Sequence, residues 1–275
     1  MNELNIKSAE QFISYKLNIK PELIRHSKDF KLKDKLIFVT NANSDLFLHP
    51  MIRSLYKNVN KDDFTLCIFD NSWTSRFPEE LYFQYGFDNI ISLDNTNRGV
   101  VEGIEESEFR GSIIHCKTVD FCLKYFKQEG VKDFILVDSD VLFKTNPFNA
   151  VDKDYVCVGE YEDEKSRIKP YFQYFNLDKL DINYYDETRM LGITSSDGYV
   201  YDTGMAFTED LKKYNKPVKY INIDDYITHF YGGSYVYAQK EITKYHKIDC
   251  NEKTQPQKSY ELVYQWLKDN NSLYL

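Results

Sequence analysis

Short runs of apolar residues, each of strand length, recur through the first half of the chain. They lie at 36–40, 64–70, 90–93 and 134–138. Because these runs are nearly continuous in apolar residues, they are typical of strands covered on both faces. Between them, the apolar spacing predicts a helix over 116–128 and shorter helices over 50–59 and 78–85. This alternation indicates an α/β fold with a mostly parallel central sheet.

The two ends of the chain show different patterns. Residues 1–34 predict a leading helix and a charged connector. The second half has strand-like runs at 155–159, 198–207 and 235–238 and a closing helix at 259–267. No repeat and no Gly/Ser-rich linker separates the halves, so we expect a single domain over residues 1–275. Its parts are the leading segment 1–34, an α/β half at 35–145 and a mixed half at 146–275.

Composition narrows the class of protein. With 35 Lys and Arg against 43 Asp and Glu, the formal net charge is -8, which argues against binding to nucleic-acid phosphates. The five cysteines include no CxxC pair, so we expect reduced thiols without disulfides or a zinc site. We also expect no signal peptide and no membrane span, because no long uncharged apolar run is present. The predicted location is cytoplasmic.

The clearest chemical signal is a pair of carboxylates at the end of a buried strand. The apolar residues of 134–137 are followed by Asp138, Ser139 and Asp140. In an extended chain, Asp138 and Asp140 share a face, and the carboxyl ends of strands are where ligands bind in open α/β sheets. Two carboxylates held together there repel unless a cation lies beside them. This spacing predicts a divalent metal site, and an acidic turn is the alternative.

A buried strand that ends in DxD after an α/β half resembles the metal-binding motif of GT-A fold glycosyltransferases. The resemblance implies a GT-A type fold in which Mn²⁺ or Mg²⁺ binds the diphosphate of a nucleotide sugar, with a UDP-sugar favoured. It implies that Asp138 and Asp140 hold the metal, with Ser139 beside the nucleotide. In the family the second carboxylate, here Asp140, binds the metal, and the first, here Asp138, often contacts the ribose or the metal's water shell. Residues 35–145 would then bind the nucleotide, and 146–275 the donor sugar and the acceptor.

Three further segments resemble the same family. The residues after the first predicted strand are similar to a nucleotide-facing loop, and those after the second to a base-reading position. The late segment THFYGG implies a third metal ligand, His229, although a structural histidine is the alternative, and its glycines allow a close approach to phosphate. The lysine that follows this segment in some GT-A families is missing here. The residues concerned are Thr40, Asn41 and Asn43, then Asp70, Asn71 and Ser72, then His229, Gly232 and Gly233.

The sequence leaves open the roles of two basic residues and the identity of a catalytic base. Lys117, which we expect at the start of the helix before the DxD strand, would contact phosphate or ribose or else be solvated, and His115 is equally open. An inverting transferase needs a carboxylate base, whereas a retaining one needs none. Asp202 is the first candidate because it precedes the apolar run MAF and lies near Gly204. The remaining candidates are Asp197, Glu209, Asp224 and Asp225.

These observations predict a metal-dependent glycosyltransferase of hexosyltransferase type, for example in polysaccharide biosynthesis. It would move a sugar from a nucleoside diphosphate sugar to a glycan or a lipid-linked saccharide, with at most peripheral contact with the inner membrane surface. One alternative is a non-catalytic carbohydrate-binding protein on a GT-A scaffold. A DxD phosphatase is less favoured, since its motif normally lies near the chain start. A nucleotidyltransferase would need a Gly-rich basic loop after the first strand, which is missing.

Overall fold

The computed structural model describes residues 22–24, 32–41, 45–70, 90–94, 110–186, 188–189 and 194–230. Its main feature is an eight-stranded sheet in the order β1-β4-β3-β2-β5-β8-β7-β9. In that order the strands are Glu22–Ile24, Ile90–Asp94, Thr65–Asp70, Lys35–Asn41, Asp133–Asp138, Arg167–Asn176, Cys157–Glu162 and Val218–Tyr220.

The middle of the sheet is parallel. Strands β4, β3, β2 and β5 pair in parallel, as the apolar runs predicted, and the α/β fold with a mostly parallel central region is confirmed. The remaining strands depart from this pattern, because β1 pairs antiparallel with β4, and β8 pairs antiparallel with both β5 and β7. A separate antiparallel pair joins β6 (Val141–Phe143) to β10 (Ile227–His229).

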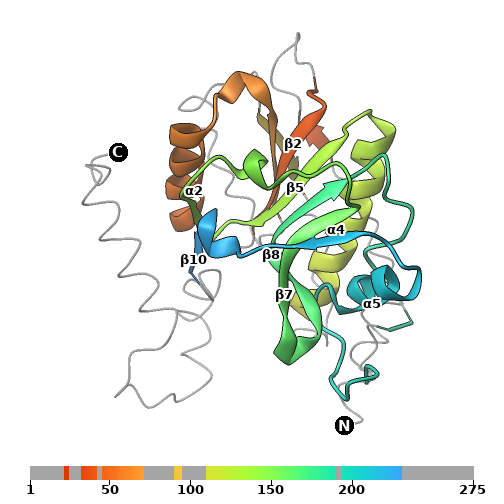
Figure 1. The fold of residues 1–275 in the computed structure, drawn as a ribbon. Coiled ribbons are helices and arrows are strands. Elements are labelled where there is room, and N and C mark those ends of the chain that lie inside the picture. Colours follow the sequence, from red (N-terminus) through yellow and green to blue (C-terminus); the bar gives the residue numbers. More distant parts are fainter. Residues whose placement is uncertain are drawn as a thin grey trace, which may run out of the picture.

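Helices cover both faces of the sheet (Figure 1). Helix α2 (Asp45–Asn58) lies on one face, while α4 (Arg110–Gln128) and α5 (Met205–Lys213) lie on the other. Strand β2 shows why two cores form, because its side chains alternate between the faces. Leu36 and Phe38 pack with α4 and α5, and Ile37 and Val39 pack with α2. Short 3₁₀ helices lie at Lys61–Asp63, Pro147–Ala150, Asp163–Lys165 and Ile223–Asp225.

Several predicted elements need correction. The leading segment contains a strand at Glu22–Ile24, which the edge of β4 holds in place, where a helix was predicted. The run 198–207 is not a strand either: only Val200 makes a bridge, to Thr194, and α5 begins at Met205. Here Gly204 has a φ of 79°, which turns the chain into the helix. The predicted elements at 78–85, 235–238 and 259–267 lie outside the described residues.

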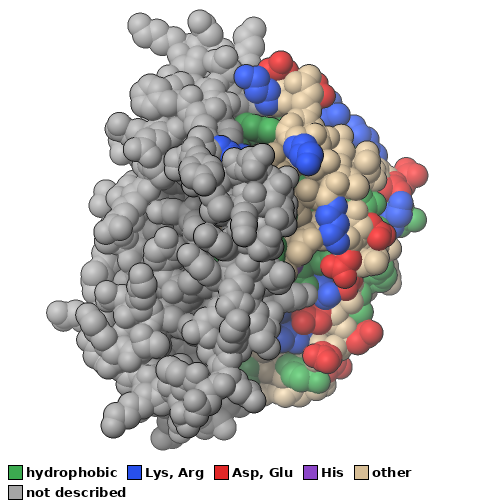
Figure 2. All heavy atoms as spheres, turned by 90° about the vertical axis from the view of Figure 1, so that its left-hand side faces the viewer, with side chains coloured by type: hydrophobic (Ala, Val, Ile, Leu, Met, Phe, Trp, Pro, Cys, Tyr) green, Lys and Arg blue, Asp and Glu red, His purple; other side chains and the backbone are tan. Residues whose placement is uncertain are grey.

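The sequence also led us to expect no membrane-spanning segment and reduced cysteines. In the residues that the structure describes, no helix has the length and apolar character needed to cross a membrane. On the face in Figure 2, basic and acidic side chains are interspersed over the described part. The described cysteines are all buried free thiols: Cys67, Cys116, Cys122 and Cys157.

One buried serine connects α2 to the small sheet that carries His229. The Ser54 hydroxyl donates to the Met51 carbonyl at 2.7 Å and accepts from the Phe143 backbone N–H at 2.9 Å. Replacing it (Ser54→Ala) leaves a buried N–H without this acceptor, so we expect the free energy of unfolding to fall by about 2 kcal/mol. Urea denaturation measures this, with the exposed Ser196→Ala as the control. An unchanged midpoint in the Ser54 variant would contradict the prediction.

Candidate metal and active site

Three predicted ligands lie together at one edge of the sheet. Asp138 is the last residue of β5, Asp140 follows in the turn, and His229 is the last residue of β10. One ligand atom from each lies within 4.8 Å of the others. The closest pair is His229 Nε2 and Asp140 Oδ1, at 3.3 Å. Two carboxylate oxygens and one imidazole nitrogen form a donor set suited to Mn²⁺ or a related divalent ion.

The pairing of β6 with β10 brings His229 to the carboxylates. The strands follow the register Val141↔His229, Thr228↔Leu142 and Ile227↔Phe143. The Phe230 backbone N–H then donates to the Asp140 carbonyl at 2.9 Å, which closes the small sheet directly beside the DxD turn. The position of the imidazole is therefore set by main-chain hydrogen bonds rather than by a long flexible loop.

Asp138 is held from two other elements. Thr40, its register partner on β2, donates its hydroxyl to Asp138 Oδ1 at 2.9 Å. On the other side, His115 Nδ1 from α4 lies 3.9 Å from the same oxygen. Burial raises the pKa of Asp138, and nearby Asp140 acts in the same direction, whereas the two histidines and the Thr40 hydroxyl oppose them. Burial also lowers the pKa of His115, which favours the neutral imidazole.

Some of the other residues predicted to bind the nucleotide lie at the same edge of the sheet. Thr40 and Asn41 end β2, and Ser139 lies between the carboxylates; all three are buried. Asp70 ends β3 in register with Asn41, so its backbone reaches the same edge, but its side chain is not described. The predicted Asn43, Asn71, Ser72, Gly232 and Gly233 lie outside the described residues.

The position expected for Lys117 is wrong. Helix α4 begins at Arg110, so Lys117 lies well inside it and not at its start. Its Nζ lies 5.2 Å from the ring centroid of Tyr185. The apolar spacing alone placed the helix start too late, because the first turn of α4 has the polar sequence RGS. The argument for a phosphate contact from a helix start therefore does not apply to this lysine.

Asp202, the predicted base, accepts four hydrogen bonds. Its Oδ1 accepts from the Ser112 hydroxyl at 2.7 Å and from the Thr203 backbone N–H at 2.7 Å. Its Oδ2 accepts from Arg167 at 2.8 Å and from Lys165 at 3.0 Å. Although burial opposes ionisation, the Arg167 guanidinium and these donors hold the pKa of Asp202 well below its usual range. Asp202 is therefore an ionised and weakly basic carboxylate, and its role as a base stays a prediction.

Of the remaining acid candidates, three lie at the surface, and Glu209 is half-buried like Asp202. Asp197, Asp224 and Asp225 are exposed. Glu209 accepts a hydrogen bond from the Tyr201 hydroxyl at 2.5 Å. Of the five candidates, Asp202 is the one that pairs with the buried Arg167, whereas Glu209 lies 3.6 Å from the less buried Arg189.

Sequence reasoning missed the cationic side of this site. Arg167, Lys165 and Lys169 come from the β7–β8 hairpin, where they pair with Asp202 or with glutamates of β7. The signal that could have found them is charge alternation, since EYE in β7 is followed by RIK in β8. Opposite charges at alternate positions of two neighbouring segments predict cross-strand pairs on one face of a hairpin.

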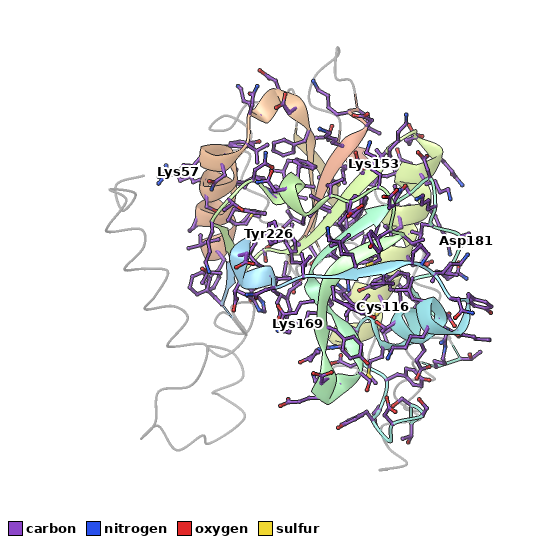
Figure 3. All side chains as sticks on the ribbon, viewed as in Figure 1. Lys57, Cys116, Lys153, Lys169, Asp181 and Tyr226 are labelled. Carbon is purple, nitrogen blue, oxygen red and sulfur yellow. The ribbon has the colours of Figure 1, made fainter. Side chains whose placement is uncertain are left out.

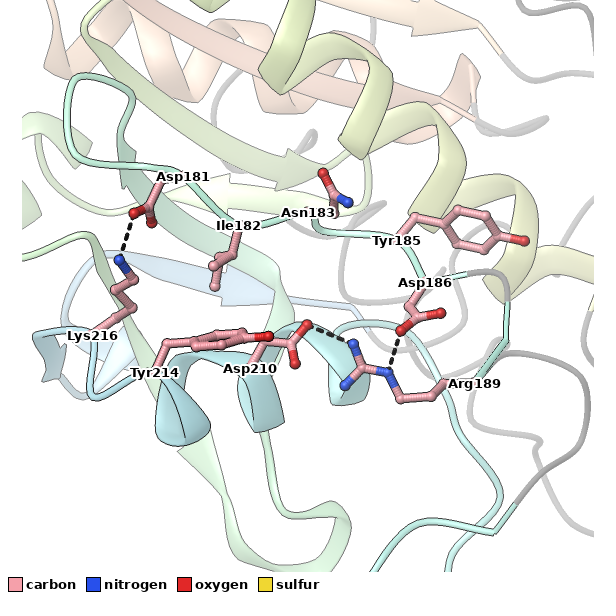
Figure 4. Close-up of a pocket in the computed structure, with 9 residues that line it drawn as sticks. All are labelled: Asp181, Ile182, Asn183, Tyr185, Asp186, Arg189, Asp210, Tyr214 and Lys216. Carbon is pink, nitrogen blue, oxygen red and sulfur yellow. Dashed lines mark hydrogen bonds and ion pairs between the residues drawn. The ribbon is translucent and has the colours of Figure 1, made fainter.

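A separate cavity of about 700 Å³ lies between α5 and the segment before it (Figure 4). At one end of it, Arg189 pairs with Asp186 at 2.7 Å and with Asp210 at 2.5 Å. At its other end, Lys216 pairs with Asp181 at 2.6 Å. None of Asp138, Asp140 and His229 lines this cavity, so it is distinct from the metal cluster.

Comparisons with known proteins give matches in structure only. No protein-family model matches the chain, and no curated protein matches its sequence. Among solved structures, galactosyltransferase LgtC in complex with donor and acceptor sugar analogs is 16% identical, with a TM-score of 0.45, covering 68% of this chain and 73% of its own. S. aureus TarS in complex with UDP is 13% identical, with a TM-score of 0.46 and coverages of 87% and 72%.

A third match is the mannosyltransferase PcManGT from Pyrobaculum calidifontis in complex with GDP-Man and Mn²⁺. It is 12% identical, with a TM-score of 0.45, covering 98% of this chain and 79% of its own. The structures that this chain resembles thus include sugar transferases. At these identities and TM-scores the similarity carries no information on the substrate, which has to follow from the side chains of the site.

Proposed function

We propose that this chain is a metal-dependent glycosyltransferase of GT-A type that transfers a hexose from a nucleoside diphosphate sugar, with a UDP-sugar favoured. The observation that carries the proposal is the cluster of Asp138, Asp140 and His229 at the carboxyl ends of parallel strands. Ligands bind at this edge in open α/β sheets. A pair of carboxylates, one buried and one half-buried, with an imidazole beside it has a clear use there, which is to hold a divalent cation.

Different residues at the carboxyl edge of the sheet would bind the metal and the nucleotide of the donor. Asp138, Asp140 and His229 would hold Mn²⁺ or Mg²⁺, which when bound supplies Lewis-acid stabilisation of the charge on the departing nucleotide. The Thr40 hydroxyl fixes the rotamer of Asp138 through its 2.9 Å hydrogen bond. Asn41 and Ser139 are buried at the same edge and would contact the nucleotide, with Asp70 next to Asn41 for the base.

On the acceptor side, we propose a glycan or a lipid-linked saccharide as the substrate and Asp202 as the proton acceptor. Asp202 lies close enough to the metal edge for its charge to influence His115, which is itself 3.9 Å from Asp138. Within this scheme the protein acts in the cytoplasm, with at most peripheral contact with the inner membrane surface.

A donor panel tests this function. We expect purified protein with Mn²⁺ to hydrolyse one sugar nucleotide slowly among UDP-glucose, UDP-galactose, UDP-N-acetylglucosamine and GDP-mannose. Chelation by EDTA should stop the hydrolysis, and added Mn²⁺ should restore it. Calorimetry with UDP should likewise show binding that depends on Mn²⁺. Saccharide binding without donor hydrolysis would instead favour a non-catalytic carbohydrate-binding protein, and nucleotide binding that ignores the metal would contradict the proposal.

A further inference from the structure

An aromatic side chain outside the predicted site lies directly on the imidazole of His229. The ring centroids of Tyr171 and His229 are 3.8 Å apart, and the planes differ by 15°. Tyr171 comes from β8, and its residue is only 6% exposed. The His229 side chain is 10% exposed, so water has little access to the stacked faces. A nearly parallel aromatic contact at this distance restricts rotation of both rings.

The β7–β8 hairpin also fixes the position of Tyr171. Lys169, which is labelled in Figure 3, lies two residues earlier on β8. Its Nζ is 5.9 Å from the Tyr171 ring centroid and forms an ion pair with Glu160 of β7. Glu160 in turn accepts a hydrogen bond from the Ile223 backbone N–H at 3.0 Å. Ile223 begins the 3₁₀ helix that leads into β10 and His229. One hairpin therefore anchors both the stacking ring and the segment that carries the imidazole.

We propose that Tyr171 is a positioning residue that orients His229 for a divalent cation, an inference that rests on the proposed metal-dependent function. An imidazole binds a metal through a lone pair in the plane of its ring. A ring stacked on its face blocks rotation out of that plane but leaves the edge accessible. The edge nitrogen Nε2 already points at Asp140, 3.3 Å away. Groups that orient a metal-bound histidine typically contribute tenfold to a hundredfold to metal affinity.

Titration with Mn²⁺ alone, followed by the EPR signal of the free ion, tests the proposal without any assay of activity. We expect Tyr171→Leu to weaken Mn²⁺ affinity by about tenfold or more, because the leucine cannot restrain the imidazole. Tyr171→Phe keeps the ring, so its affinity should stay within about twofold of wild type. The matched control is Phe175→Leu, which removes a buried ring from the same strand but in the other core.

Each outcome has a defined meaning. If wild type binds Mn²⁺ and Tyr171→Leu binds it equally well, the positioning role is wrong while the metal site remains. An equal loss in Phe175→Leu would also overturn it, since general loss of packing would then explain the effect. If wild type binds no Mn²⁺, both this inference and the proposed function fail. Circular dichroism shows whether each variant is folded. If Tyr171→Leu does not fold, Tyr171→Met replaces it in the test, and we expect the same loss of Mn²⁺ affinity.

Discussion

Asp140→Asn should remove Mn²⁺ binding and lower the metal-dependent transfer rate by about a hundredfold or more. The substitution keeps the shape of the side chain but removes the charge that lies 3.3 Å from His229 Nε2. A metal's stabilisation of the departing nucleotide is worth several kcal/mol, and each 1.4 kcal/mol corresponds to a factor of ten in rate. Calorimetry with Mn²⁺ and a transfer assay with the active donor measure the two effects.

The fold should survive this change. The main chain at residue 140 is held by the Phe230 N–H, which donates to the Asp140 carbonyl and not to the carboxylate. Asp178→Asn is the matched control, because it removes one exposed carboxylate elsewhere and should leave Mn²⁺ affinity unchanged. Retained Mn²⁺ affinity in the folded Asp140 variant would mean that the DxD segment is an acidic turn and not a metal site.

The parallel part of the sheet could be predicted because its physical cause is local. A strand covered on both faces has to be apolar along its whole length, so 36–40, 64–70 and 134–138 were identified within about one residue of their observed ends. Asp138 and Asp140 followed from the same logic, since charges that end such a strand interrupt an otherwise apolar run. The residues that end the parallel strands, including Asp138, could therefore be predicted from the sequences of the strands themselves.

The rest of the site depends on contacts between distant segments. The strands β6 and β10 have only three residues each, which is too short for a period-two pattern to be read. Their pairing nevertheless decides where His229 lies. Tyr171 and Arg167 lie in β8, which the sequence did not predict as a strand, because arginine, tyrosine, glutamine and asparagine occupy most of its buried positions and interrupt the apolar ones. Such residues become interpretable only when their partners are known.

Asp202 shows how tertiary contacts change the meaning of a predicted residue. The segment around it looked strand-like, whereas the structure places it just before α5 with Arg167 and Lys165 on one carboxylate oxygen. These contacts lower the pKa of Asp202 in the folded state, so they stabilise the fold fully at any pH above the ordinary aspartate pKa of about 3.9. This stabilisation is lost progressively as the pH falls from there toward the lowered pKa of the folded state. At neutral pH the carboxylate is therefore available to accept a proton, but it is a weak base.

For the proposed role, Asp202→Asn should lower the transfer rate by about a hundredfold while donor affinity stays close to wild type. The amide cannot accept the proton of the acceptor hydroxyl, and the donor site at Asp138 and Asp140 is unchanged. Initial rates with saturating donor measure the first effect, and calorimetry the second. The products should have the inverted anomeric configuration by NMR, because a base of this kind serves direct displacement by the acceptor.

A second variant distinguishes a base from an anchor for Arg167. Lys165 is the most exposed donor to Asp202, with 44% of its side chain accessible, so it is the group that an acceptor hydroxyl would most easily displace. Removing it (Lys165→Met) takes one cation from the carboxylate and raises the pKa of Asp202. At neutral pH the transfer rate should then rise, because a carboxylate with a higher pKa is a stronger base. An unchanged transfer rate, or products that retain the donor's configuration, would show that Asp202 only holds Arg167 in place.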